Sequence, residues 1–252
     1  MHLTPNRVLR TFRYAMHFDG IDDYVDCGNN PSLNTTTEAT VEAIFFSMNE
    51  PWLVKDSRFF SKGNRKLTTM LTFGCWHHPR IFFEIIVGVT CYSANYWINH
   101  YGKWWFITGT LKAGKWVKLY DSGVLKVTNN DCPISSLDIS NTNLIIGMCS
   151  TEPHCYHYKG YIHTIRYYNR VLSDIEIRYN LDNPDNPIRD GLVLWLKSDP
   201  NYVKDIDNDG ILEWIDLSGY KNHGKIYGAV LTKVIKDPIS VRQPRRILSV
   251  VR

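Results

Sequence analysis

The sequence lacks the motifs that identify several common enzyme classes. It contains no GxSxG, no HExxH and no P-loop string. It also lacks the E-x-D-x-E and E-x-D-x-x-E strings that place two carboxylates roughly 5 Å apart on one strand in β-sandwich glycoside hydrolases. A glycosidase would need a carboxylate pair assembled from distant strands. We therefore expect the protein not to be an enzyme.

Long apolar runs are also absent. No stretch reaches the roughly 18 apolar residues that a membrane helix needs, so we expect no membrane span. Residues 1–13 are basic but lack the apolar centre of a secretory signal; no signal peptide is visible, and a cleaved one would leave no trace. The net charge of +4 is mild and gives no clear indication of nucleic-acid binding.

None of the six cysteines forms a CxxC pair, which argues against a zinc ribbon. The even number permits up to three disulfides, as in a secreted or hyperthermophilic protein. Cys149 and Cys155 flank a short turn and could close it. The alternative is that the cysteines are buried free thiols.

Aromatic residues are abundant, and turn signals recur about every ten residues between short apolar segments. This spacing favours a sandwich or jelly roll over βαβ units. The expected strands are 40–47, 58–62, 67–73, 80–87, 104–111, 115–120, 124–127, 143–148 and 160–168.

The stretch RYAMHFDGIDDYVD at residues 13–26 has alternating apolar residues on both sides of a break at residues 19–23. Gly20 permits a positive φ and Asp tolerates tight turns, so the pattern predicts strand, turn, strand in a hairpin. Ser173 and Glu176 form a capping box that predicts a short helix to about Asn180, closing one end of the sandwich.

Three stretches together resemble a known family. They are residues 13–26, the hairpin KWVKLYDSGVL at 115–125, and GxIxxxRxYNRxLSxxEI at 160–177. The chain resembles the concanavalin A-like lectin/glucanase (laminin-G-like) family. The resemblance implies an all-β, antiparallel jelly-roll β-sandwich over residues 14–182, with one short capping helix. Chains of this kind with added terminal segments resemble those of hyperthermophilic archaea and their viruses.

Residues 183–232 contain DGLVLWL at 190–196 and DLSGYKNHGKIYG at 216–228. Both resemble the first strands of the family, which normally precede the segment at residues 13–26. We expect these C-terminal strands to complete the sandwich, because a bare sheet edge invites pairing. They could do so in their own chain, as in a permuted fold, or on a neighbouring subunit; a small second lobe is the other alternative.

The remaining segments, 1–13 and 233–252, are basic extended arms that share the pattern P-x-R-[VI]-L-x-x-[FV]-R. The matched positions are Arg7, Val8, Leu9 and Arg13 in the first arm and Arg246, Ile247, Leu248 and Arg252 in the second. Such arms could add to a sheet edge or lie in a groove of a neighbour. The alternative is two basic tails without a function.

Residues 205–216 have the spacing of a twelve-position calcium loop. The expected ligands are the side chains of Asp205, Asp207, Asp209 and Asp216 and the carbonyl of Ile211. The alternative is a DxDG turn between strands. A second possible calcium site is Asp19, Asp22 and Asp23; the resemblance implies an acidic partner after the later G-x-I string, where this chain has His163.

Two functions remain open. The first is a non-enzymatic structural protein of a virion or cell surface, which assembles with itself or other structural proteins through its arms. The alternative is a calcium-dependent carbohydrate-binding module, since exposed aromatic rings can stack on sugars. Candidate rings are Trp76, Tyr92, Tyr96, Trp97, Trp104 and Trp105. Both functions imply an extracellular surface or virion location.

Overall fold

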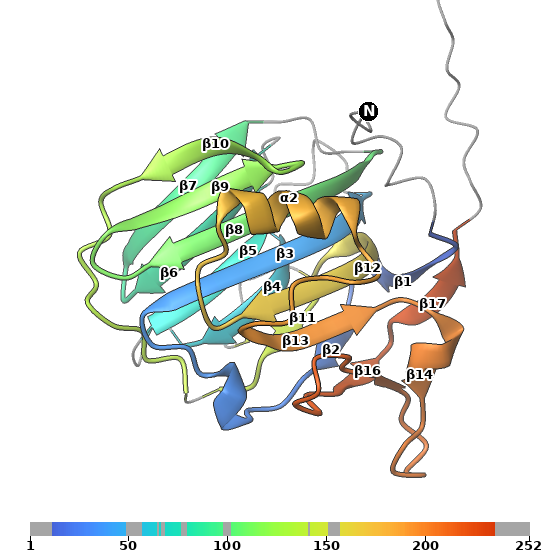
Figure 1. Ribbon diagram of the computed structural model, residues 1–252. Helices are drawn as coiled ribbons and strands as arrows, with labels where there is room; N and C mark the ends of the chain where they lie inside the picture. The colour runs from blue at the N-terminus through green and yellow to red at the C-terminus, as the bar shows by residue number, and fades with distance from the viewer. Residues whose placement is uncertain are drawn as a thin grey trace, which may run out of the picture.

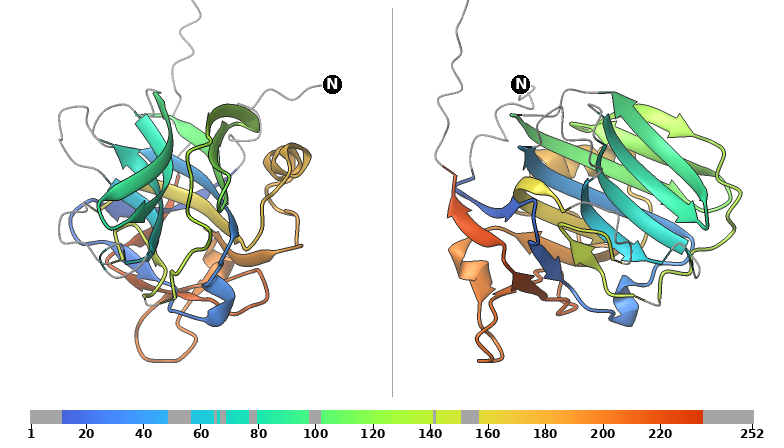
Figure 2. Two further views of the ribbon diagram at one scale, coloured as in Figure 1. Left: turned by 90° about the vertical axis from the view of Figure 1, so that its left-hand side faces the viewer. Right: turned by 180° about the vertical axis from the view of Figure 1, so that it is seen from behind.

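The computed structural model describes residues 12–48, 57–64, 66, 69–76, 80–97, 102–140, 142–150 and 157–234, apart from the side chain of Trp76. Within these residues the strands form two antiparallel sheets packed as layers (Figures 1 and 2). None of the helices in this part of the chain has the length and apolar character needed to cross a membrane.

The first sheet has eight strands in the order β10-β9-β8-β3-β12-β1-β17, with β13 also paired to β12. Their bounds are β1 (Tyr14–Asp19), β3 (Glu38–Ser47), β8 (Trp104–Lys112), β9 (Trp116–Asp121), β10 (Val124–Asn129), β12 (Lys159–Tyr168), β13 (Leu192–Lys197) and β17 (Val230–Lys233).

The second sheet has nine strands in the order β14-β15-β16-β2-β11-β4-β5-β6-β7. Their bounds are β2 (Tyr24–Asp26), β4 (Ser57–Gly63), β5 (Thr69–Trp76), β6 (Arg80–Val87), β7 (Thr90–Trp97), β11 (Ile145–Ile146), β14 (Val203–Lys204), β15 (Glu213–Trp214) and β16 (Gly224–Tyr227). Two short 3-10 helices, η1 (Pro31–Leu33) and η2 (Pro200–Tyr202), lie in the connections.

The core lies between the sheets and is rich in aromatic rings. Phe45 stacks on Phe59 with ring centroids 4.7 Å apart. The Phe59 ring also contacts Phe73 in a tilted arrangement and Tyr158 edge-on. All four side chains are fully buried. Inward-facing residues alternate along strands of both sheets, as a sandwich requires. The predicted all-β, antiparallel β-sandwich is therefore confirmed.

The expected hairpin at residues 13–26 is wrong in one respect: its two strands do not pair with each other. β1 pairs with β12 and β17 of the first sheet, whereas β2 pairs with β11 and β16 of the second. The turn between them is thus a corner that crosses from one layer to the other. Gly20 has φ +82°, and a Cβ there would lie 2.7 Å from the Lys159 Cβ, so both conformation and space require glycine.

The predicted helix is α2 (Asp174–Asp182), and both hydrogen bonds of its capping box are present. Its expected position at one end of the sandwich is wrong. α2 lies across the outer face of the first sheet, over β8, β3 and β12 (Figure 1). Ile177 and Leu181 pack there with Phe106 and Trp195 in a second apolar cluster. The helix therefore covers a sheet face that would otherwise expose apolar side chains.

A buried polar network ties α2 to that sheet. Arg166 Nη1 lies 2.9 Å from Glu42 Oε2, and both side chains are at most 1% exposed. The Asn180 side-chain amide, from α2, donates to the same Glu42 oxygen at 3.0 Å, and Arg166 Nη2 donates to the Pro184 carbonyl. Burial raises the pKa of Glu42, and Arg166 opposes that shift. Each charge is tolerated only because the other is present.

The C-terminal strands join both sheets of the same chain. β13 pairs with β12, β16 with β2, and β17 with β1. β1 and β13 share one edge of β12, and Ser198 fills the junction: its hydroxyl donates to the Ile162 carbonyl and accepts the Met16 amide. Beyond β17, the Val234 amide donates to the Arg13 carbonyl at 2.8 Å.

His163 is buried beside this junction. It lies 2.9 Å from the Tyr14 carbonyl through Nδ1, and its ring stacks on Phe12 with centroids 4.1 Å apart. Burial, assisted by the positive charges of Lys197 and Arg166, lowers the pKa of His163 to about 4. The imidazole is therefore neutral in the folded protein at neutral pH.

Cysteine pairing is limited in the described residues. Cys27, Cys75 and Cys132 are free thiols, and the Cys91 thiol donates a hydrogen bond to Glu84 Oε2 at 2.9 Å. Cys149 is disulfide-bonded, and Cys155, its expected partner, lies outside the described residues.

Replacing one partner of the buried ion pair should destabilise the fold strongly. We expect Arg166→Met to lower the free energy of unfolding by about 3–5 kcal/mol, because Glu42 is left buried and uncompensated. The double variant Glu42→Leu with Arg166→Met should recover part of this loss. Urea unfolding of the two single variants and the double variant measures the coupling. Additive single effects would contradict a direct pair.

The His163 imidazole should make stability fall in acid. Its pKa is 6.5 when unfolded and about 4 when folded, so between these values only the unfolded state binds the proton. The free energy of unfolding is then highest above pH 6.5 and falls by about 3 kcal/mol towards pH 4. Urea unfolding from pH 7 to pH 4 should give a flatter profile for His163→Gln. An unchanged slope would show that other groups cause the acid sensitivity.

Candidate functional site

The outer face of β2 and β16 carries a row of polar and aromatic side chains. Val25 and Ile226 point into the core, so their neighbours in sequence project outwards, because side chains alternate along a strand. These neighbours are Tyr24 and Asp26 on β2 and Lys225 and Tyr227 on β16. The register places Tyr24 opposite Tyr227 and Asp26 opposite Lys225.

Tyr24 and Tyr227 form an aromatic pair on this face. Their ring centroids are 4.7 Å apart and the planes are 17° from parallel. Both residues are half-buried, so part of each ring reaches solvent. Partial burial, followed by the proximity of Tyr227 and Asp26, raises the pKa of Tyr24, which keeps its hydroxyl protonated.

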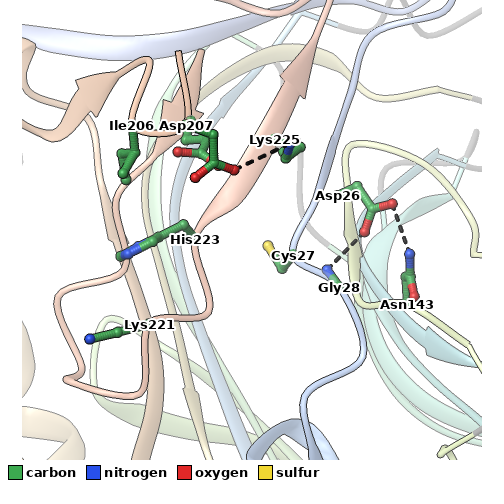
Figure 3. A pocket seen from close by; sticks show the side chains of 10 residues that line it. Asp26, Cys27, Gly28, Asn143, Ile206, Asp207, Lys221, His223 and Lys225 are labelled. Atoms are coloured by element: carbon green, nitrogen blue, oxygen red, sulfur yellow. Dashed lines mark hydrogen bonds and ion pairs between the residues drawn. The ribbon is translucent and has the colours of Figure 1, made fainter. Parts of the chain in front are cut away.

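A polar pocket of about 370 Å³ opens two residues further along the same strands (Figure 3). It is lined by Asp26, Cys27, Gly28, Asn143, Ile206, Asp207, Glu213, Lys221, His223 and Lys225. The Asp26 carboxylate accepts the Gly28 amide at 2.8 Å and the Asn143 side-chain amide at 2.9 Å, which fixes its orientation. The pocket thus offers both hydrogen-bond donors and acceptors.

Glu213 is the one residue of the pocket lining with a buried side-chain atom that lacks a hydrogen-bond partner in the described part of the chain. Its neighbour Trp214 lies in the core, so Glu213 faces outwards, directly opposite Lys225. It is only 5% exposed, and Oε2 is buried without a hydrogen-bond partner among the described residues. The Lys225 ammonium lies instead 2.7 Å from Asp209 and 3.6 Å from Asp207. A buried carboxylate without a partner is unfavourable, so this position is suited to a ligand that donates hydrogen bonds.

An acidic cluster lies at the other end of the row. Ligand atoms of Asp19, Asp22 and Asp23 come within 4.8 Å of one another, the one such set of three among the described residues. Burial, followed by the charges of Asp19 and Asp22, raises the pKa of Asp23. A Cβ at Gly228 would lie 2.1 Å from Asp23 Oδ1, which places the cluster beside the aromatic pair.

The structure does not bring His163 to this cluster. Its ring contacts the carbonyl of Tyr14, at the start of β1, whereas Asp19 is at the end of that strand. The acidic partner implied by the family resemblance is therefore not replaced by His163.

The ligands predicted for the calcium loop at 205–216 do not converge. Asp205 accepts the amides of Asp209 and Gly210, and Asp209 accepts the amide of Ile211 and the Lys225 ammonium. The Lys225 ammonium, which lies 2.7 Å from Asp209 and 3.6 Å from Asp207, lowers the pKa of Asp209. The loop is held by its own backbone amides and one lysine.

Asp216, the expected twelfth ligand, is bound elsewhere. It is 6% exposed and accepts the backbone amides of Trp195, Ser218 and Asn222 and the Ser218 hydroxyl. Asp216 therefore holds the turn at 216–222 against β13. A calcium ion bound by this loop stays a prediction for which the described geometry offers no ligand set.

The aromatic residues singled out in the sequence occupy different environments. Tyr92, Tyr96 and Trp105 pack against the core, and Trp104 packs with Phe12 against the cluster under α2. Trp97 is 54% exposed, with the Arg80 guanidinium 3.7 Å from its ring centre. None of these five rings lines the pocket, and the side chain of Trp76 lies outside the described part of the chain.

The proposed docking positions of the arms lie outside the described residues, except Arg13. These are Arg7, Val8, Leu9, Arg246, Ile247, Leu248 and Arg252. Self-assembly through the arms and a virion or cell-surface location stay predictions.

The Tyr24–Tyr227 pair and Glu213 were not predicted from the sequence. Each residue carried a signal: Tyr24 and Tyr227 stand next to apolar residues in strand-like alternation, and Glu213 precedes a tryptophan. The sequence does not show the pairing register of β2 with β16, because these strands are about 200 residues apart in the chain.

Solved structures share this architecture. One is a Bacteroides ovatus protein named for carbohydrate binding, with 14% identity over 88% of this chain and a TM-score of 0.67; this chain spans 60% of its length. A SAP-like pentraxin of Limulus polyphemus has 10% identity over 69% of this chain and 82% of its own, with a TM-score of 0.51. These similarities show the fold.

A third similar structure is CBM40 of the Ruminococcus gnavus IT-sialidase, bound to α2,3-sialyllactose, with 16% identity over 66% of this chain and 95% of its own and a TM-score of 0.51. Comparison with curated protein sequences finds no match. The family model described as the concanavalin A-like lectin/glucanases superfamily matches residues 19–178, more than half of the chain. The chain therefore belongs to the concanavalin A-like lectin/glucanases superfamily.

Proposed function

We propose that this protein is a non-catalytic carbohydrate-binding domain whose ligand lies on the outer face of β2 and β16. The observation that carries the proposal is the Tyr24–Tyr227 pair beside a pocket that contains the unpartnered Glu213. An aromatic surface suits the apolar face of a sugar ring, and convergent polar groups suit its hydroxyls. The lectin-like fold and the names of similar structures support the same function.

The chemistry of the pocket fits recognition of a polyol. Asp26 and Glu213 can accept hydrogen bonds from hydroxyl groups, while the Asn143 amide and the Lys221 ammonium can donate. The aromatic pair lies two residues along the strands, a separation of roughly 7 Å. One oligosaccharide can therefore contact both.

We further propose that Asp19, Asp22 and Asp23 bind calcium at the edge of this surface. Calcium takes six to eight oxygen ligands, and a cation would offset the repulsion among three carboxylates. The buried Asp23 fits this role because it has no ammonium or guanidinium partner among the described residues. Bound calcium would fix the corner from which β2, and hence Tyr24, begins.

Removing either ring of the aromatic pair should weaken glycan binding. We expect Tyr24→Ala and Tyr227→Ala each to lower affinity about tenfold, since one aromatic contact contributes about 1–1.5 kcal/mol. A glycan array identifies the ligand, and isothermal titration calorimetry then measures affinity. Tyr179→Ala, a partly exposed tyrosine on α2, is the matched control and should bind as the unmodified protein does. Wild-type affinity in both test variants would locate the site elsewhere.

Calcium should raise the melting temperature, because an ion that binds only the folded state stabilises it by mass action, about 2.7 kcal/mol at one hundred times Kd. Asp22→Asn should abolish the shift, whereas Asp205→Asn should preserve it. Differential scanning fluorimetry with calcium and with chelator measures both. A shift that is lost in Asp205→Asn and kept in Asp22→Asn would assign the ion to the loop at 205–216. No shift in the unmodified protein would argue against calcium at either site.

A further inference from the structure

Glu213 gives the pocket a preference for ligands that carry a positive charge or donate hydrogen bonds. Its carboxylate is buried at the wall of the pocket, and Oε2 has no partner among the described residues. Taking an ionised carboxylate out of water without compensation is strongly unfavourable, and a positive partner gives the largest relief. The missing partner is therefore a cation or a strong hydrogen-bond donor.

The protein's own lysines do not supply this partner. Lys225 stands opposite Glu213 in the ladder, but its ammonium lies against Asp209 and Asp207. Lys221 is exposed at the rim and forms no described ion pair with Glu213. Three carboxylates and two lysines line the pocket, and one of those lysines also binds Asp209 outside it. The pocket thus has an excess of negative charge.

A metal ion does not fit this position. No set of three ligand atoms from the pocket meets the spacing for a metal among the described residues; only the cluster at Asp19, Asp22 and Asp23 does. A cationic group carried on a larger ligand, held also by the aromatic pair, is better suited.

We propose that the pocket binds the amino group of an amino sugar, with Glu213 as its ion-pair partner. This proposal rests on the proposed carbohydrate-binding function. An ammonium group at Glu213 donates to a carboxylate that is otherwise unpaired, and the Asp26 oxygens accept from the neighbouring hydroxyls. The sugar ring next along the chain then lies against Tyr24 and Tyr227.

The test compares three tetrasaccharides that differ only at C2: chitosan tetraose, chitin tetraose and cellotetraose. Isothermal titration calorimetry should show chitosan tetraose binding at least tenfold more tightly than the other two. Glu213→Gln should remove this preference, because the amide keeps the shape and loses the charge. Asp182→Asn, which changes an exposed carboxylate on α2, should retain it.

The outcomes separate the two proposals. Equal affinity for all three sugars, or glycan-array binding without chitosan binding, overturns the amino-sugar proposal and leaves the carbohydrate-binding function standing. Binding to no glycan overturns both. A preference that survives Glu213→Gln assigns the amine to another carboxylate and overturns the role of Glu213.

Stability gives an independent readout of the same carboxylate. If Glu213 is unpaired in the free protein, Glu213→Gln should raise the midpoint of urea unfolding. If Lys225 turns back to pair with Glu213 in solution, the variant should lower the midpoint. A lowered midpoint would contradict the proposal, because Glu213 would then already have its positive partner.

Discussion

The backbone pairing of β2 with β16 is the interaction on which the candidate site depends. Three paired positions define the register, and that register places Tyr24 beside Tyr227 and Asp26 beside Lys225. A slip of one residue would turn every one of these side chains into the core and bring Val25 and Ile226 to the surface. The site is therefore not carried by one loop; it is made where the start and the end of the chain lie side by side.

Two buried carboxylates, Glu42 under α2 and Glu213 in the pocket, differ in whether they have hydrogen-bond partners. Glu42 has Arg166, Asn180 and Thr108 as partners, and its role is to hold α2 on the sheet. Glu213 is 5% exposed at the wall of the pocket, and its Oε2 has no such partner among the described residues. Packing alone does not require a carboxylate there, because a glutamine would fit the same space. An unsatisfied group at a pocket is typical of a position kept for a ligand.

Much of the fold could be predicted from local sequence. The capping box at Ser173 and Glu176 and the hairpin of β9 with β10 depend on residues close in the chain, and both are present. β7 (Thr90–Trp97) was missed because its residues are polar and lie near the sheet edge. The turn at Asp19–Asp23 was interpreted as a hairpin because strand–turn–strand patterns do not say whether the two strands share a sheet. The position of α2 was wrong because a capping box specifies where a helix starts and not what it packs on.

The site could be predicted much less well. The calcium spacing at 205–216 is a one-dimensional pattern, and its carboxylates are equally able to accept backbone amides, as Asp205 and Asp216 do here. The acidic cluster at Asp19, Asp22 and Asp23 was visible because its members are neighbours in sequence. Tyr227 and Glu213 could not be joined to Tyr24 without the long-range register.

The hydrogen bond from the Val234 amide to the Arg13 carbonyl has a consequence for how this arrangement of strands could arise. Segments 190–196 and 216–228 resemble the opening strands of the family, yet they follow the helix in this chain. Because residues 13 and 234 are adjacent, a peptide link between them and a break before residue 190 would restore the usual order without moving a strand. The two strand orders therefore describe the same spatial arrangement of strands and differ only in where the chain has its termini.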